Sequence, residues 1–173
     1  MNRRLTRNTD LNYYKDYPTE GNCGSFALRI QEWYEPDDSL KVWNCDYVDW
    51  LLTKGVNRKE ILDKLLKRSL VGIKNDFGDS IVFLNKLSDY KEKKDEELIA
   101  FRVGIERYEN CADVDFHFRV FRDGRWQEKC GAEDVRDNIS LEEDRPWNSC
   151  EWIYDSEIAY FVHKLGDENV SEL

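Results

Sequence analysis

Hydrophobic positions in the first half of the chain recur with the period of a helix. After Cys23 they return every three or four residues, which is the spacing of one buried helical face. The positions that form this stripe are Phe26, Ala27, Ile30, Trp33 and Tyr34. We therefore predict a helix that begins at Cys23 and holds Cys23 in the first turn of its buried stripe. The segment EPDDS at 35–39 predicts a turn after this helix.

Three more helices are predicted before the pattern changes. Residues 46–55 indicate a short helix that Gly55 closes. Asn57 has the character of an N-cap, and Glu60, three residues later, completes a capping-box pattern. The helix that follows is expected to bury Ile61, Leu62, Leu65 and Leu66. Residues 79–97 predict a further helix that runs into a charged, solvated tail.

Near residue 97 the hydrophobic period changes to two, which is typical of strands. Residues 98–105 alternate, and the clearest strand is DVDFHFRVF at 113–121. One face of that strand is formed by Val114, Phe116, Phe118 and Val120. The other face is formed by Asp113, Asp115, His117 and Arg119. The alternation thus predicts that His117 lies on the polar face, away from the core.

The last third of the chain continues as antiparallel strands. RDGR at 122–125 predicts a hairpin turn, after which WQEKCG returns antiparallel. A loop rich in acids and Asn follows, and residues 151–164 predict at least one closing strand. Helices in the N-terminal half packed on an antiparallel sheet in the C-terminal half indicate an α+β fold. We expect residues 1–173 to form a single domain, with 1–18 as an N-terminal extension.

Composition and net charge limit the classes of partner that this protein is expected to bind. The chain is 40% hydrophobic and 13% aromatic, so it should fold rather than stay disordered. A net charge of -10 excludes nucleic acid as the expected partner and disfavours an anionic membrane. With nucleic acid and anionic membranes set aside, we expect the partner to be a peptide or a protein. No apolar run approaches the length of a membrane span, and no apolar stretch follows the basic first residues as in a secretory signal. We expect a cytoplasmic protein, with export by a route without a cleaved signal left open.

The cysteines predict free thiols. They are odd in number and widely scattered, at Cys23, Cys45, Cys111, Cys130 and Cys150. A disulfide scaffold would be denser and even in number, and a zinc site would show close pairs such as C-x-x-C. Because the chain has only two histidines, we expect neither a metal site nor another cofactor.

Cys23 and His117 each have a structural interpretation. A cysteine in an apolar stripe is more often a core residue, and a lone histidine is more often structural or exposed. Together they predict chemistry, because a thiol near the positive end of a helix dipole is favoured as thiolate and a histidine can serve as its base. Asn22 can cap the helix or offer an amide N–H to an oxyanion. Gly24 is expected to leave room for a substrate.

Two segments resemble the papain-like cysteine peptidases, including the NlpC-like cell-wall amidases. NCGSFAL is similar to their nucleophile segment, and DFHFRVFRDGRWQEKCG to a histidine hairpin found in bacterial members. The residues that carry the second likeness are His117, Gly124, Trp126, Lys129 and Gly131. The resemblance implies a nucleophile at the start of a helix packed on an antiparallel sheet, a histidine on a later strand and a polar third residue on the next strand. Glu128 stands where a third histidine is expected, and Cys130 where proline is.

The third residue depends on the register of the hairpin. A two-residue loop pairs His117 with Cys130 and places Glu128 on the face of His117. A three-residue loop with a bulge would instead bring Lys129 opposite His117. We favour Glu128, because a carboxylate can accept from an imidazole N–H. Asp115 is the alternative.

Two classes of function follow. The first is a cysteine hydrolase acting on an amide, peptide or thioester, in which Cys23 attacks, His117 is the general base and Glu128 orients it. The oxyanion would be held by the backbone N–H of Cys23 and by Asn22. The second is a catalytically silent protein-binding module on the same fold, for instance an inhibitor or a decoy encoded by a mobile element.

Overall fold

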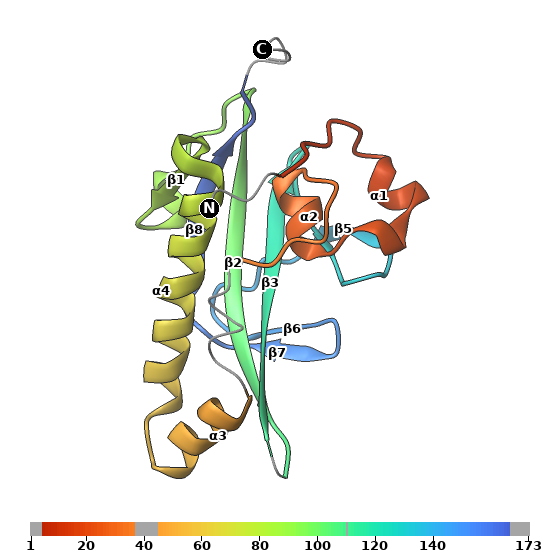
Figure 1. Ribbon diagram of the computed structural model, residues 1–173. Helices are drawn as coiled ribbons and strands as arrows, with labels where there is room; N and C mark the ends of the chain where they lie inside the picture. The colour runs from red at the N-terminus through yellow and green to blue at the C-terminus, as the bar shows by residue number, and fades with distance from the viewer. Residues whose placement is uncertain (1–4, 37–44, 110, 167–173) are drawn as a thin grey trace.

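A computed structural model describes residues 5–36, 45–109 and 111–166 (Figure 1). Its α-helices in these ranges are α1 (Tyr13–Asp16), α2 (Cys23–Leu28), α3 (Cys45–Thr53) and α4 (Arg58–Phe77), and its 3-10 turns are η1 (Pro18–Glu20), η2 (Gly78–Ser80) and η3 (Leu87–Asp89). The main sheet consists, in spatial order, of β1 (Ile81–Leu84), β8 (Ala159–Lys164), β2 (Glu96–Arg107), β3 (Ala112–Arg122), β4 (Arg125–Lys129) and β5 (Val135–Ile139). A second sheet pairs β6 (Trp147–Ser149) with β7 (Trp152–Tyr154). All these pairs are antiparallel, which confirms the α+β class with an antiparallel sheet.

Both faces of the central strands are covered. On one face α2 and α4 pack against β2 and β3, as Figure 1 shows, and enclose the larger hydrophobic core. On the other face the β6–β7 hairpin lies over β2 and β3. It contributes to a second cluster formed by Ala100, Leu141, Trp147, Tyr154 and Tyr160. His117 and Arg119 on β3, which point away from the first core, are therefore buried as well.

The predicted helices at 46–55 and after Asn57 are confirmed with small shifts in their bounds. Gly55 follows α3 with a positive φ of 78°, the left-handed conformation that glycine tolerates best. The Asn57 side chain caps α4 by accepting from the backbone N–H of Lys59, while Glu60 pairs with Lys64 one turn on. Helix α4 buries Ile61, Leu62, Leu65 and Leu66, as expected.

The helix predicted from Cys23 ends earlier than its hydrophobic stripe. It stops at Leu28, because Arg29 adopts a left-handed conformation and its N–H bonds back to the carbonyl of Ser25. The Ser25 hydroxyl then donates to the carbonyl of Glu32, which folds the chain back on the helix. Beyond Leu28, Ile30 and Tyr34 are buried, whereas Trp33 is 45% exposed. The hydrophobic positions after Leu28 therefore belong to an irregular segment and not to one face of a helix. Of the predicted turn at 35–39, residues 37–39 lie outside the described residues.

The helix predicted over 79–97 is wrong. This segment forms the turn η2, the strand β1 and the turn η3 instead. Strand β1 pairs with β8, with Ile81 opposite His163. A short apolar run has no periodicity of its own that separates strand from helix, so pairing with a distant strand decided its conformation.

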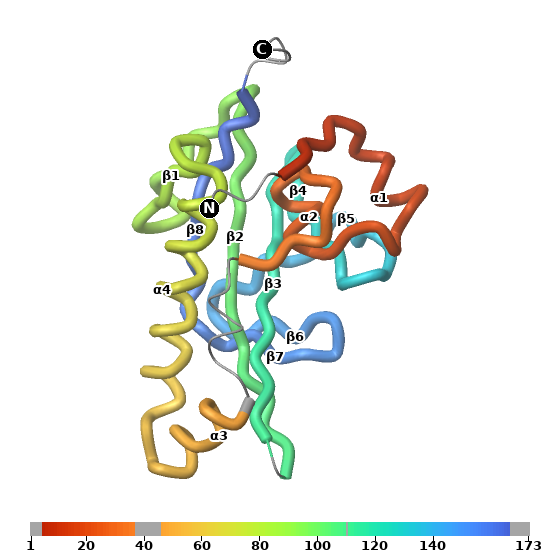
Figure 2. Tube along the Cα trace, in the orientation of Figure 1, coloured from red at the N-terminus to blue at the C-terminus, as the bar shows by residue number. Residues whose placement is uncertain are grey.

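The N-terminal segment is in close contact with the domain, as the tube in Figure 2 shows. The structure describes it from residue 5 onward. Arg7 forms a β-bridge with Ile30, and Tyr14 is fully buried. The Tyr14 hydroxyl lies within hydrogen-bonding distance of the carbonyls of Ser25 and Ile30, the nearer at 2.5 Å. The part of residues 1–18 that is described thus supports α2. Within the described ranges, no helix combines the length and apolar character needed to cross a membrane.

The β3–β4 hairpin has the two-residue turn. Asp123 and Gly124 both have positive φ, 53° and 72°, as a type I′ turn requires. Arg122 pairs with Arg125 and Arg119 with Glu128. The register that places Glu128 on the same face as His117 is therefore the one observed, and the three-residue alternative is wrong.

Stability should fall as His163 becomes protonated. This side chain is 8% exposed and its Nδ1 has no hydrogen-bond partner. Burial lowers the pKa of His163 from 6.5 to about 4. The negative charge of Glu97 raises this pKa, and the positive charges of Arg7, Arg29 and Arg122 lower it further. Because the folded pKa is depressed, the unfolded chain binds more protons between these values, and stability is lost as the pH falls from 6.5 to about 4. The full loss is about 3 kcal/mol at about 1.4 kcal/mol per pKa unit.

Urea unfolding followed across this pH window measures the effect. We expect His163→Leu to flatten the pH dependence of the free energy of unfolding in this window. The substitution removes the titrating group and puts an apolar side chain of similar size in its place. An unchanged slope in His163→Leu would show that another group is responsible.

Candidate functional site

A cavity of about 460 Å³ brings together four distant parts of the chain. The start of α2, the middle of β3, the end of β4 and the β6–β7 hairpin all contribute to its lining. Its chemically distinctive residues are Cys23, Asp115, His117, Cys130, Cys150 and Tyr154. The two residues that the sequence singled out, Cys23 and His117, thus line one cavity although 94 positions separate them in the numbering (117 − 23).

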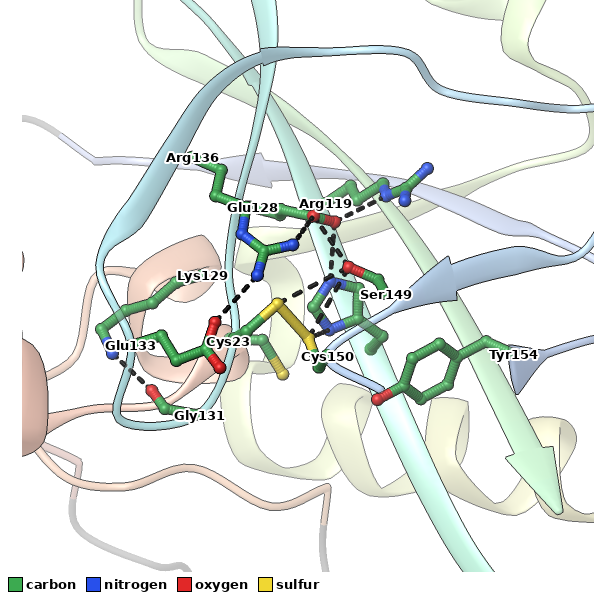
Figure 3. The surroundings of a disulfide bond; sticks show 12 residues. Cys23, Arg119, Glu128, Lys129, Gly131, Glu133, Arg136, Ser149, Cys150 and Tyr154 are labelled. Atoms are coloured by element: carbon green, nitrogen blue, oxygen red, sulfur yellow. Dashed lines mark hydrogen bonds and ion pairs between the residues drawn. A yellow bond between two sulfur atoms is a disulfide. The ribbon is translucent and has the colours of Figure 1, made fainter. Parts of the chain in front are cut away.

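His117 is held by contacts with Glu128, Cys150 and Tyr154, whose side chains are labelled in Figure 3. It is 1% exposed, and its ring stacks on Tyr154 with the centroids 5.1 Å apart. Its Nε2 lies 2.9 Å from a carboxylate oxygen of Glu128, and its Nδ1 lies 3.7 Å from the sulfur of Cys150. The predicted face is correct, since His117 points away from the main core. The β6–β7 hairpin buries that face, which the sequence did not indicate.

Glu128 is the partner of His117. Its carboxylate also lies 2.9 Å from Nε of Arg119 and accepts from the hydroxyl of Ser149 at 2.8 Å. Burial alone would raise the pKa of Glu128, but His117, Arg119 and Ser149 outweigh it and lower the pKa to about 2. Glu128 is therefore ionised and is placed to accept a proton from Nε2. In that tautomer the lone pair of an uncharged imidazole lies on Nδ1, which faces the sulfur of Cys150.

Asp115, the alternative partner, has a different contact. It accepts a hydrogen bond from the hydroxyl of Tyr154 at 2.8 Å. Burial raises the pKa of Asp115. Through Tyr154, which stacks on His117, Asp115 supports the ring from the side rather than binding its nitrogen.

Cys23 lies against the backbone of β3 at Phe116, the residue before His117. Its sulfur is 3.9 Å from the carbonyl oxygen of Phe116, to which the thiol donates. Burial raises the pKa of the Cys23 thiol to about 12, and the charge of Asp115 acts in the same direction. The raised pKa stands against the thiolate predicted from the sequence, and burial is its largest cause. Within the described residues, no hydrogen bond joins Cys23 to His117.

The neighbours of Cys23 have structural tasks. The Asn22 side chain accepts from the N–H of Ser25 and donates to the carbonyl of Tyr34, and its backbone N–H donates to the Ser25 hydroxyl. Of the two predicted roles, Asn22 thus performs the capping one, for which its backbone N–H and its side-chain oxygen are used, while Nδ2 bonds to Tyr34. A Cβ on Gly24 would lie 2.8 Å from the ring of Tyr34. The space at Gly24 is therefore filled by Tyr34, and the prediction of room for a substrate there is wrong.

Two cysteines predicted as free thiols form a disulfide. Cys130 follows β4 and Cys150 lies in the turn between β6 and β7, with their Cα atoms 5.2 Å apart. Cys23 and Cys111 are free. The two cysteines are 20 residues apart in the sequence, so no local pattern predicts that they pair. The odd number of cysteines in the chain also argued against a disulfide. Ser149 and Tyr154 also belong to the site, and only their position in the folded hairpin identifies them.

The chain has no match among known protein families, curated proteins or solved structures. The likeness to papain-like enzymes therefore remains a prediction from the two sequence segments.

Proposed function

We propose that the cavity is the active site of a cysteine hydrolase acting on an amide, peptide or thioester. The observation that carries the proposal is the buried His117–Glu128 pair, whose histidine lines the same cavity as Cys23. Nucleophilic catalysis requires a carboxylate on one imidazole nitrogen and a thiol that can reach the other. Its order along the chain, with the cysteine at a helix start and the histidine and carboxylate on consecutive strands, is that of the papain-like fold.

In the proposed reaction, Nδ1 of His117 takes the proton of Cys23 and the sulfur attacks the substrate carbonyl. Glu128 stabilises the imidazolium that forms and fixes the orientation of the ring through Nε2. The backbone N–H of Cys23 is the oxyanion donor that remains after Asn22 is used in capping. The imidazolium then protonates the leaving group, and water attacks the thioester to regenerate Cys23. Catalytic contacts that are long in a resting enzyme shorten when substrate binds.

Acylation by a p-nitrophenyl ester tests this proposal. We expect the reduced protein to release nitrophenolate and to carry the acyl group on Cys23, as located by peptide mass spectrometry. His117→Gln should slow acylation by about 10²–10⁴-fold, because the general base is lost. Cys111→Ser, at another free cysteine, is the matched control and should react at the wild-type rate. Acylation of Cys23 at equal rates in wild type and His117→Gln would contradict the proposal.

A catalytically silent protein-binding module is the second candidate. The raised pKa of Cys23 favours it, since a buried thiol that stays protonated behaves as a core residue. Large aromatic side chains are also exposed, as at Trp33, Tyr47 and Trp50, and such residues are enriched at protein interfaces. Absence of acylation on Cys23 in the reduced protein would favour this candidate.

A further inference from the structure

The cavity contains a group of metal-binding atoms separate from the proposed nucleophile. Nδ1 of His117 and the sulfurs of Cys130 and Cys150 all lie within 4.8 Å of one another. Zn–S bonds of about 2.3 Å and Zn–N bonds of about 2.0 Å place tetrahedral ligand atoms roughly 3.5 Å apart. The distance of 3.7 Å between Nδ1 and the Cys150 sulfur already meets this requirement.

We propose that Cys130, Cys150 and His117 form a zinc site when the disulfide between the two cysteines is reduced. Two thiolates and an imidazole are ligands that suit Zn²⁺. Because all three residues line the cavity, the fourth tetrahedral position is open to it. The zinc site does not use Cys23, but it takes Nδ1 of His117, the proposed general base, so the zinc-bound form would lack that base. The zinc proposal does not depend on the hydrolase activity.

The surroundings of His117 are those of a metal ligand. Histidines that bind zinc usually donate their other N–H to a carboxylate, which fixes the tautomer and makes the ligating nitrogen more basic. Glu128 has this position on Nε2, 2.9 Å away, and Ser149 holds the second carboxylate oxygen. The stack on Tyr154 fixes the plane of the ring. His117 is thus oriented toward the sulfurs before any metal binds.

The charges of the reduced site also balance. Zn²⁺ with two thiolates and one neutral imidazole carries no net charge, so burying this group avoids the cost of an isolated ion. The nearby carboxylate of Glu128 is paired with the buried Arg119 and, at 3.7 Å, with Arg136.

Formation of the site requires a dithiol reductant. The dithiol transfers two electrons and two protons to the Cys130–Cys150 disulfide, becomes a disulfide itself and leaves two protein thiols. Zn²⁺ binding then releases those two protons to solvent, because the ligands are thiolates. In the reverse exchange, a small-molecule disulfide accepts two electrons from Cys130 and Cys150 and two protons from solvent and becomes a dithiol. The protein disulfide re-forms, both sulfur ligands are lost and the ion is released.

Cobalt, which replaces zinc and absorbs light when bound to thiolates, tests the proposal. The full chain is reduced with dithiothreitol, freed of it under anaerobic conditions and titrated with Co²⁺ and then Zn²⁺. We expect thiolate-to-cobalt absorption at one ion per chain, displaced by Zn²⁺ and absent from the oxidised protein. Cys150→Ser should abolish the absorption, while Cys111→Ser and Cys23→Ser should retain it. Glu128→Gln should weaken Zn²⁺ binding by about 10–100-fold.

A measurement without variants guards against a misfolded Cys150→Ser. In the reduced wild-type protein, Zn²⁺ should protect Cys130 and Cys150, but not Cys111, from alkylation by iodoacetamide. Absence of cobalt absorption together with absence of protection would overturn the proposal, and so would undiminished absorption in a folded Cys150→Ser. Retained absorption in Cys23→Ser, which lacks the proposed nucleophile, separates the zinc site from the hydrolase proposal.

Discussion

Replacing Phe118 by alanine should lower the free energy of unfolding by about 3–5 kcal/mol, the usual cost of deleting a buried aromatic ring. Phe118 is 1% exposed and lies in the main core, where its ring centroid is 4.6 Å from that of Phe101. It also contacts Tyr34, the residue that packs over Gly24 beside the Cys23 sulfur. The substitution should therefore loosen the start of α2 as well as the sheet.

Chemical denaturation measures this change, with Phe83→Ala as the matched control. Phe83 is 42% exposed on the edge strand β1, so the same deletion there removes far less buried surface. Equal losses in the two variants would mean that Phe118 does not carry the packing assigned to it. His117→Ala is not a neutral comparison, because His117 is buried under the β6–β7 hairpin and its Nε2 contacts the carboxylate of Glu128.

Glu97→Ala should destabilise the fold by about 3–5 kcal/mol, because it leaves buried arginines without their counter-charge. Glu97, 4% exposed, bonds to the guanidinium groups of Arg29 and Arg122. Arg122 also donates to the carbonyl of Phe26 in α2. The carboxylate thus joins the end of α2 to β2 and β3, and its removal should affect the helix that positions Cys23.

The matched control for Glu97 is Glu60→Ala. Glu60 is 2.7 Å from Lys64 on the exposed face of α4, and such pairs contribute about 0.3–0.5 kcal/mol. Thermal or urea unfolding compares the two variants directly. If both lower stability by the same small amount, the buried cluster around Glu97 does not hold α2 to the sheet.

Local signals in the sequence predicted the parts of the site that local structure determines. The Asp123–Gly124 turn has a strong conformational preference, so the register that brings Glu128 to His117 followed from it. The alternation of β3 likewise predicted the face of His117. The predictions for α3 and α4 succeeded because capping residues and hydrophobic period agreed.

The remaining features depend on contacts between distant segments. The three-residue strands β6 and β7 are too short to show a period, yet they bury His117 and supply Cys150 and Ser149. The disulfide joins residues whose proximity arises only when β4 and this hairpin meet. The short length of α2 depends on bonds made by Ser25 to residues beyond the helix, which no hydrophobic pattern encodes.

The position of β8 has a consequence for the order in which the protein can be assembled during synthesis. This strand is the last of the described strands along the chain, yet in the sheet it lies between β1 and β2. Until the ribosome has released it, β1 has no neighbour in the main sheet and one long edge of β2 presents unpaired backbone groups. Open edges of this kind pair readily with other chains. A nascent chain that pauses before residue 159 is thus in its most aggregation-prone state although most of its core residues have been made.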